Sequence, residues 1–458
     1  MNLETVDRPV VPAADRAWPP GFLWGASTSA YQIEGATTAD GRGASIWDVR
    51  VHEPGRVTDG DTGDEACDHY HRYAEDVGLM RRIGLDAYRF SVSWPRVLPT
   101  GRGTVNAAGL DFYDRLIDSL LAAGIEPWLC LYHWDLPQAL QELGGWENRD
   151  SAGWFADYAV LIARRFGDRV KRFATFNEPA VFTIFGYVLD WQAPGIKNRD
   201  SYLAAVHHVN LAHGAAVDVL RDLVPGAQIG AIHNRQPCRP AGSEPGDLAA
   251  AELMDLCWNQ AFPEPQIRGT YPPRFAEAIE RWVKAGDLAR ICRPTDWFGL
   301  NHYSPIYMKA DPSAELGFAW TGPPPDEPQT GVGWVIDADA FRDTLAEVHR
   351  RYRLPIYVTE NGYGADDRLD ERGEVVDPDR IRYLDAYIGA MGEAIDGGAD
   401  VRGYFVWSLL DNFEWGSGFG QRFGIVYVDY ATQQRRLKAS AKWYADRIRA
   451  ARAVTAGR

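Results

Sequence analysis

Short apolar segments of the buried-strand kind recur along the chain, and amphipathic helical patterns separate most of them. Gly109–Ala123, Trp154–Phe166 and Asp339–Tyr352 are examples of these helices, with apolar side chains repeating on one face. Alternation of this kind predicts a closed parallel (β/α)8 TIM barrel before it predicts an open doubly wound sheet. The eight segments are Phe22–Ala26, Ala87–Ser91, Pro127–Tyr132, Arg172–Phe176, Gln228–Ile232, Trp297–Leu300, Ile356–Thr359 and Tyr404–Trp407.

The chain is expected to form one catalytic domain with extended βα loops. No G-x-G-x-x-G fingerprint follows the first segment, which weakens the dinucleotide-binding alternative. The length of 458 residues fits one barrel, because barrels with insertions exceed about 400 residues. We predict an N-terminal arm over residues 1–18, the barrel over residues 19–450 and a tail over residues 451–458. The Pro- and Gly-rich stretch Ser304–Gly333 predicts an irregular loop at the barrel mouth.

Composition narrows the classes of partner. The net charge is −15, and no basic cluster interrupts the acidic balance, so neither nucleic acid nor an anionic membrane is predicted. The five cysteines are odd in number and lack CxxC spacing, which favours neither disulfides nor a zinc site. Residues 1–20 lack an apolar signal-peptide core, and no run of about eighteen apolar residues follows. A cytoplasmic protein is therefore expected.

Two glutamates are the strongest functional signal. Glu178 lies in Ala174–Pro179 and Glu360 in Val358–Gly362, and each ends an apolar run just before a strand-breaking residue. In a barrel, Glu178 would follow the fourth strand and Glu360 the seventh, so both carboxyl groups would meet at the carboxyl-terminal rim. Paired carboxyl groups there are what cleavage of a glycosidic bond requires.

The chemistry demands that the two carboxyl groups differ in protonation. One must hold a proton near neutral pH while the other stays ionised, and burial and neighbouring charge are the means available. Arg89, at the end of the second predicted strand, is the obvious cation to keep one carboxylate charged. A purely structural ion pair is the alternative for this arginine.

Several motifs make the chain resemble the β-glucosidases of glycoside hydrolase family 1 from about Phe22 to Tyr444. The resemblance implies a retaining mechanism, with Glu178 as acid/base and Glu360 as nucleophile. Retention would place the two carboxyl groups about 5–5.5 Å apart. The motifs that carry the resemblance, in the family's order, are Phe22–Ala26 with Tyr31–Gly35, Tyr132–Pro137, Thr175–Pro179, Thr359–Gly362 and Asn412–Trp415.

The resemblance also implies a sugar pocket that mixes hydrogen-bond donors and acceptors, as recognition of hydroxyl groups requires. Trp407 would stack under the apolar face of the sugar, and Asn177 would bind its 2-hydroxyl. Tyr303 would donate a hydrogen bond to Glu360. Without the motif context, each of these side chains could instead have a purely structural role in packing. The other implied members are Gln32, His133, Glu414 and Trp415 in the sugar pocket, with Arg89 and Asn301 in support.

One residue that matches the family pattern and one that departs from it predict the class of substrate. Glu414 could accept hydrogen bonds from the sugar 4- and 6-hydroxyls but would repel a 6-phosphate, which favours unphosphorylated sugars. Where the family usually has tryptophan after Asn-Glu-Pro, this chain has Ala180, which predicts an open leaving-group side. Trp334 could supply another stacking surface there. Gln192 and Gln421 also depart from the family pattern.

The predicted function is hydrolysis of small β-glycosides or short β-gluco-oligosaccharides, chiefly β-glucosides. β-Galactosides and β-fucosides are possible additional substrates, because losing one hydroxyl contact costs only a few kcal/mol. No cofactor or metal is predicted, since two carboxyl groups suffice and the histidines lack H-E-x-x-H spacing. A catalytically silent sugar-binding barrel would have lost Glu178 or Glu360. Transglycosylation uses the same intermediate and stays open, and the sequence predicts no oligomeric state.

Overall fold

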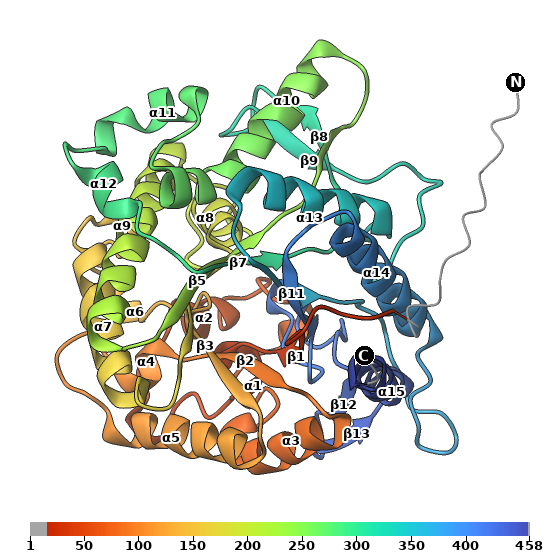
Figure 1. The fold of residues 1–458 in the computed structure, drawn as a ribbon. Coiled ribbons are helices and arrows are strands. Elements are labelled where there is room, and N and C mark those ends of the chain that lie inside the picture. Colours follow the sequence, from red (N-terminus) through yellow and green to blue (C-terminus); the bar gives the residue numbers. More distant parts are fainter. Residues whose placement is uncertain (1–15, 457–458) are drawn as a thin grey trace, which may run out of the picture.

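Parallel strands close into a barrel in the computed structural model, which describes residues 16–456. The order around the barrel is β1-β11-β10-β7-β5-β4-β3-β2, which confirms the predicted (β/α)8 architecture. Figure 1 shows the helices ringed around these strands. Each predicted segment overlaps one barrel strand: β1 Leu23–Ser27, β2 Ala87–Ser91, β3 Glu126–Tyr132, β4 Arg172–Asn177, β5 Gln228–Asn234, β7 Trp297–Asn301, β10 Ile356–Asn361 and β11 Val401–Trp407.

The helices occupy the intervals that the apolar periodicity indicated. The three predicted examples correspond to α5, α7 and α13, each starting within three residues of its predicted start. No helix among residues 16–456 is both long and apolar enough to cross a membrane. The helices are α1 Ala30–Ile33, α2 Ile46–Val51, α3 His69–Ile83, α4 Trp94–Val97, α5 Ala107–Ala122, α6 Gln138–Gln141, α7 Ser151–Phe166, α8 Pro179–Tyr187, α9 Arg199–Leu223, α10 Pro245–Asp255, α11 Pro273–Ile279, α12 Asp287–Ile291, α13 Ala338–Tyr352, α14 Pro378–Asp396 and α15 Ala439–Ala456.

The two ends of the chain were predicted as an arm and a tail. Residues 1–15 of the arm lie outside the described residues, but Trp18 is buried, with its ring centroid 5.0 Å from that of Trp24. At the other end, α15 continues through the predicted tail as far as Ala456.

Large aromatic side chains fill the barrel interior. The ring centroid of Trp128 lies 5.2 Å from that of Trp297 and 5.1 Å from that of Phe405. Glycines on neighbouring strands make room for them: a Cβ on Gly25 would approach the Phe405 ring to 2.4 Å, and one on Gly230 would approach the Trp297 ring to 2.4 Å. The interior is therefore a packed core, and a site can form only above it at the strand ends.

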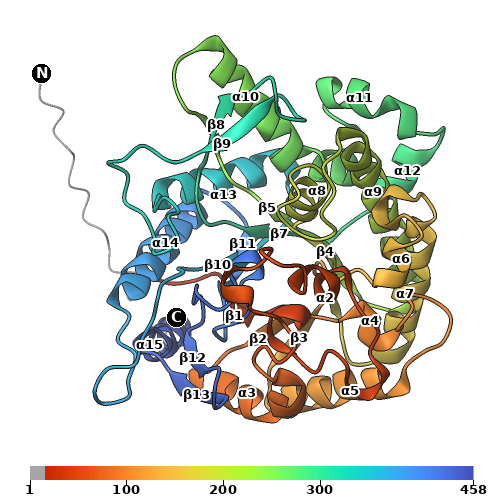
Figure 2. The same cartoon turned by 180° about the vertical axis from the view of Figure 1, so that it is seen from behind.

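The stretch Ser304–Gly333 was predicted to be irregular, and this was wrong over part of its length. It contains β8, Ile306–Ala310, and β9, Phe318–Thr321, which pair antiparallel. With β6, Cys238–Pro240, they form a three-stranded sheet outside the barrel, next to α10 (Figure 1 and Figure 2). The Pro and Gly residues that suggested a loop are concentrated after β9. The apolar and aromatic residues of the stretch lie mainly within β8 and β9 themselves.

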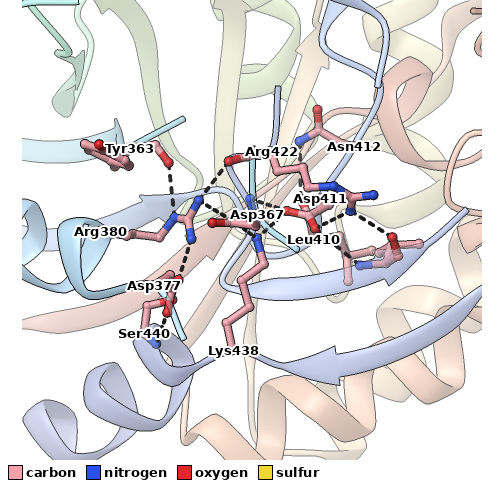
Figure 3. Close-up of polar contacts among 12 residues, drawn as sticks. Tyr363, Asp367, Asp377, Arg380, Leu410, Asp411, Asn412, Arg422, Lys438 and Ser440 are labelled. Atoms are coloured by element: carbon pink, nitrogen blue, oxygen red, sulfur yellow. Dashed lines mark hydrogen bonds and ion pairs between the residues drawn. The ribbon is translucent and has the colours of Figure 1, made fainter. Parts of the chain in front are cut away.

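A buried ion network ties the C-terminal hairpin of β12, Val426–Asp429, and β13, Gln434–Leu437, to loops on the site side of the barrel (Figure 3). Lys438 is fully buried, and its Nζ lies 2.5 Å from Asp367 and 2.6 Å from Asp411. Arg380 pairs with Asp367 at 2.6 Å, and Arg422 pairs with Asp411 at 2.7 Å. These pairs hold the loops after β10 and β11, and the second of these loops carries Glu414 and Trp415, two of the predicted sugar-binding residues.

Candidate active site

A cavity of about 450 Å³ lies at the carboxyl ends of the barrel strands, where the sequence predicted the site. Glu178 and Glu360 both line it. Ala180 is buried within α8 and does not line the cavity. The other predicted residues in the cavity wall are His133, Tyr303, Trp334, Trp407, Glu414 and Trp415, while Gln32, Arg89, Asn177 and Asn301 are buried and hydrogen-bonded behind that wall.

A tight strand-to-helix turn positions Glu178. β4 ends at Asn177, α8 begins at Pro179, and Glu178 between them has φ 49° and ψ 58°. Non-glycine residues seldom adopt this left-handed conformation, and such outliers cluster at functional sites. The backbone N–H of Glu178 donates to the carbonyl of Ile232 at 2.9 Å, so β5 holds the turn in place.

Glu360 belongs to β10 itself, at a point where the register of that strand shifts against both neighbours. Irregularities of this kind re-aim a side chain, here into the cavity. Both oxygens of the carboxyl group are held. Arg89 donates to Oε1 at 2.5 Å, and the Tyr303 hydroxyl donates to Oε2 at 2.7 Å. Two donors, one of them cationic, favour the ionised form of Glu360.

Glu178 and Glu360 differ in protonation for identifiable reasons. Burial raises the pKa of Glu178 to about 8, and the nearby charge of Glu360 is the second cause. Burial also raises the pKa of Glu360, but Arg89 and the Tyr303 hydroxyl oppose that rise. At neutral pH the proton therefore resides on Glu178, and Glu360 is the charged partner.

A third carboxyl group, that of Glu414, shares the cavity. Gln32 donates through Nε2 to Glu414 Oε2 at 3.2 Å and to Asn412 Oδ1 at 3.0 Å. Burial raises the pKa of Glu414 to about 8, followed by the charges of Glu360 and Glu178. Arg89 pairs with Glu360 and not with Glu414, so no cation offsets this rise, and the protonated Glu414 can donate as well as accept hydrogen bonds.

The polar residues behind Glu360 form one connected group. Arg89 donates through Nη2 to Asn177 Oδ1 at 2.7 Å, and the same Nη2 lies 3.2 Å from His133 Nδ1. Asn301 donates through Nδ2 to Asn177 Oδ1 at 3.1 Å. Burial, and next the charge of Arg89, lower the pKa of His133 well below its ordinary value, so the imidazole is neutral.

Aromatic rings form the walls on the predicted sugar side. Trp407, the last residue of β11, is nearly parallel to the His133 ring, with an interplanar angle of 21° and centroids 5.9 Å apart. Trp415 packs against Trp134 with centroids 4.6 Å apart. A flat indole face beside the neutral His133 imidazole and the Glu414 carboxyl group suits a sugar ring, which has both apolar C–H faces and polar edges.

The predicted leaving-group side holds residues that sequence reasoning missed. Four aromatic side chains surround it, and Trp191 is half exposed there. From α8, Val181 and Phe185 line the cavity instead of Ala180. Trp334 also lines it, with its ring centroid 5.0 Å from that of Tyr303. The four clustered rings are Phe185, Trp191, Trp258 and Trp320, with neighbouring centroids 5.3 to 6.1 Å apart.

Asn234 was missed because the predicted fifth strand ended two residues too early. It is the last residue of β5, lines the cavity and donates to Glu178 Oε1 at 2.7 Å. Its place at the carboxyl end of a barrel strand was a usable signal. Within residues 16–456, no group of three or more His, Cys, Asp or Glu side chains could hold a metal ion.

Comparison with known proteins agrees with this geometry. The model of glycosyl hydrolase family 1 matches residues 14–452. β-Glucosidase A of Thermotoga maritima is 46% identical over 441 residues, covering 95% of this chain and 98% of that protein. A bifunctional β-D-glucosidase/β-D-fucosidase of Bifidobacterium breve is 42% identical, covering 93% of this chain and 97% of that protein.

Solved structures are equally similar. The family 1 β-glucosidase of Thermotoga maritima superposes with a TM-score of 0.90 at 45% identity, covering 95% of this chain and 98% of that one. The psychrophilic β-glucosidase of Micrococcus antarcticus gives a TM-score of 0.92 at 44% identity, covering 96% and 99%. With the family model spanning nearly the whole chain around a barrel that carries the paired glutamates, this protein belongs to glycosyl hydrolase family 1.

Proposed function

We propose that this glycoside hydrolase releases terminal, non-reducing β-D-glucosyl residues with retention of configuration. One observation carries the proposal: a single cavity holds one carboxyl group bound by a cation and another with a raised pKa. Arg89 and Tyr303 hold Glu360 in its ionised form. Glu178 has a pKa of about 8 and therefore bears a proton at neutral pH. Acid-assisted displacement at an anomeric carbon needs this combination.

The reaction proceeds in two displacements. In the first, a carboxylate oxygen of Glu360 bonds to the anomeric carbon, the bond from that carbon to the leaving oxygen breaks, and Glu178 gives its proton to that oxygen. In the second, the Glu178 carboxylate takes a proton from water, whose oxygen bonds to the anomeric carbon and displaces Glu360. Two inversions amount to retention. The separation of about 5–5.5 Å between the carboxyl groups stays a prediction.

The glycone is proposed to lie on Trp407, with its hydroxyl groups facing the polar wall. Asn177 would bind the 2-hydroxyl, while Glu414 would bind the 4- and 6-hydroxyls. Support comes from the burial of the Asn177 side chain and from the hydrogen bond that Gln32 donates to Glu414. His133 and the indole N–H of Trp415 complete the set.

A 6-phosphate is proposed to be rejected, although for a reason that differs from simple repulsion by Glu414. The raised pKa of Glu414 means that the cavity is not strongly anionic at this point. None of the cavity-lining residues is Lys or Arg, and Arg89 behind them is already paired with Glu360. A phosphate dianion would thus lose its hydration without gaining a cation. β-Fucosides lack the 6-hydroxyl and are proposed as additional substrates, together with β-galactosides.

The leaving-group side is proposed to favour planar aromatic aglycones and short β-gluco-oligosaccharides. The cluster of Phe185, Trp191, Trp258 and Trp320 provides flat apolar surfaces for either class. The absence of a tryptophan at Ala180 is proposed to leave space for bulkier groups. Because Ala180 does not line the cavity whereas Val181 does, Ala180 would act through the position of Val181 rather than by contact.

We also propose that the enzyme works in the cytoplasm, where it would cleave products of cellulose degradation such as cellobiose. The five cysteines all have free thiols, which suits a reducing compartment.

A kinetic panel tests the proposed function. Aryl β-gluco-, β-galacto-, β-fuco- and 6-phospho-β-glucosides and cellobiose are compared, and the anomer released first is identified by NMR. We expect the β-anomer of glucose, good turnover of glucosides and none of the 6-phosphate. Glu360→Gln should lose nearly all turnover while still binding the sugar. Release of the α-anomer, or full activity of Glu360→Gln, would refute the mechanism.

A further inference from the structure

Trp258 occupies an unusual place next to the acid/base residue. It lies in a π-helical turn, Leu256–Gln260, that directly follows α10, and such turns are frequent at functional sites. Its indole is buried, with centroids 5.6 Å from Phe185 and 6.1 Å from Trp320, and it lines the leaving-group side of the cavity. The indole Nε1 donates to Asn234 Oδ1 at 3.1 Å.

This hydrogen bond determines which way the Asn234 amide faces. An indole nitrogen can only donate, so the Asn234 atom that it meets must be the carbonyl oxygen. Gln236 donates through Nε2 to the same Oδ1 at 2.7 Å. The amide nitrogen of Asn234 is therefore turned toward Glu178, where it donates to Oε1 at 2.7 Å.

A second amide reaches the same oxygen of Glu178. Asn301 donates through Nδ2 to Oε1 at 2.9 Å and to Asn177 Oδ1 at 3.1 Å. The orientation of Asn177 is settled by Arg89, a pure donor that meets its Oδ1 at 2.7 Å. Two N–H groups thus converge on Oε1, which leaves Oε2 as the oxygen that carries the acid proton. No described residue forms a hydrogen bond with Oε2.

The turn that carries Trp258 is itself locked to the end of β5. Asn259 accepts through Oδ1 from the backbone N–H of Gln236 at 3.2 Å, and it donates through Nδ2 to the carbonyl of Gln236 at 2.8 Å. Asn259 Nδ2 also donates to Asp255 Oδ1 at 2.7 Å. The indole of Trp258, the amide of Asn234 and the carboxyl group of Glu178 are consequently joined by one continuous set of hydrogen bonds.

We propose that Trp258 is a positioning residue for acid catalysis, which acts through Asn234 to keep the protonated Oε2 of Glu178 facing the leaving group. The proton on Oε2 passes to the leaving oxygen as its bond to the anomeric carbon breaks, and Oε1 stays bound to the two amides. This inference rests on the proposed glucosidase function. It gives Trp258 two roles: its ring would contact the aglycone, and its N–H group would orient Glu178 through Asn234.

Trp258→Phe tests the inference, because phenylalanine keeps an aromatic ring but has no N–H group. Phenyl β-D-glucoside needs a proton on its leaving group, whereas 2,4-dinitrophenyl β-D-glucoside does not. We expect kcat/KM to fall about tenfold for the phenyl glucoside and less than about twofold for the dinitrophenyl glucoside. The basic limb of the pH profile should also move to higher pH, because the Asn234 bond holds the pKa of Glu178 down.

Two further variants separate positioning from packing. Trp320→Phe shrinks a ring of the same cluster without touching Asn234, so any loss should be equal for the two glucosides. Asn234→Ala removes the link itself and should reproduce the unequal loss even if Trp258→Phe folds poorly. If Trp258→Phe and Asn234→Ala each lose as much kcat/KM for the dinitrophenyl glucoside as for the phenyl glucoside, the positioning role is overturned, and the glucosidase function still stands. A wild-type enzyme that cleaves neither glucoside would refute both.

Discussion

The raised pKa of Glu178 predicts how activity falls in alkaline solution. With a pKa of about 8, the carboxyl group is roughly 90% protonated at pH 7, whereas at its ordinary value of 4.5 it would be about 0.3% protonated. The structure thus supplies about 300 times more of the acid form, equivalent to roughly 5 kcal/mol of differential interaction between the two protonation states. Burial and the Glu360 charge provide it.

The assay is kcat/KM for phenyl β-D-glucoside as a function of pH, since this ratio reports the free enzyme. We expect it to decline as pH rises through about 8, because Glu178 loses the proton that the leaving group needs. Glu178→Gln should remove this basic limb along with most activity. Glu414 has a similar pKa, so Glu414→Gln is the matched control, and the limb should persist in it.

Two results would refute this reasoning. A basic limb near pH 5 would mean that burial and Glu360 do not hold the proton on Glu178. If the basic limb disappears in Glu414→Gln and persists in Glu178→Gln, the group that titrates is Glu414 and not Glu178. As an internal check, 2,4-dinitrophenyl β-D-glucoside should show little basic limb in the wild type.

Lys438→Met should lower the free energy of unfolding by about 3–5 kcal/mol, because Asp367 and Asp411 lose a buried cation; urea denaturation measures it. Lys442→Met is the control, since this lysine is exposed and its loss should cost no more than about 1 kcal/mol; equal costs would contradict the role of burial. Ala180→Trp should lower kcat/KM for bulky aryl glucosides relative to phenyl glucoside, and an unchanged ratio would reject the proposed spacious leaving-group side.

Local pattern was enough to predict the barrel and to locate its two key glutamates. Strand segments of four to six mainly apolar residues were visible because parallel barrel strands are buried on both faces. Glu178 and Glu360 stood out because each breaks such a run at its carboxyl end. The loop prediction over Ser304–Gly333 failed over β8 and β9, which pair with each other; β8 also pairs with the distant β6 and packs against α10, and local pattern does not report these contacts.

The sequence by itself determined which residue types stand at the strand ends, because strand, turn and helix preferences act between near neighbours. Only the tertiary structure decided what those residues do to one another. The pKa of Glu178 depends on burial and on a carboxylate far away in the chain. The orientation of Asn234 depends on the N–H group of Trp258, and Val181 rather than Ala180 reaches the cavity. These properties arise from distances between side chains on separate strands and helices, which exist only once the barrel has closed.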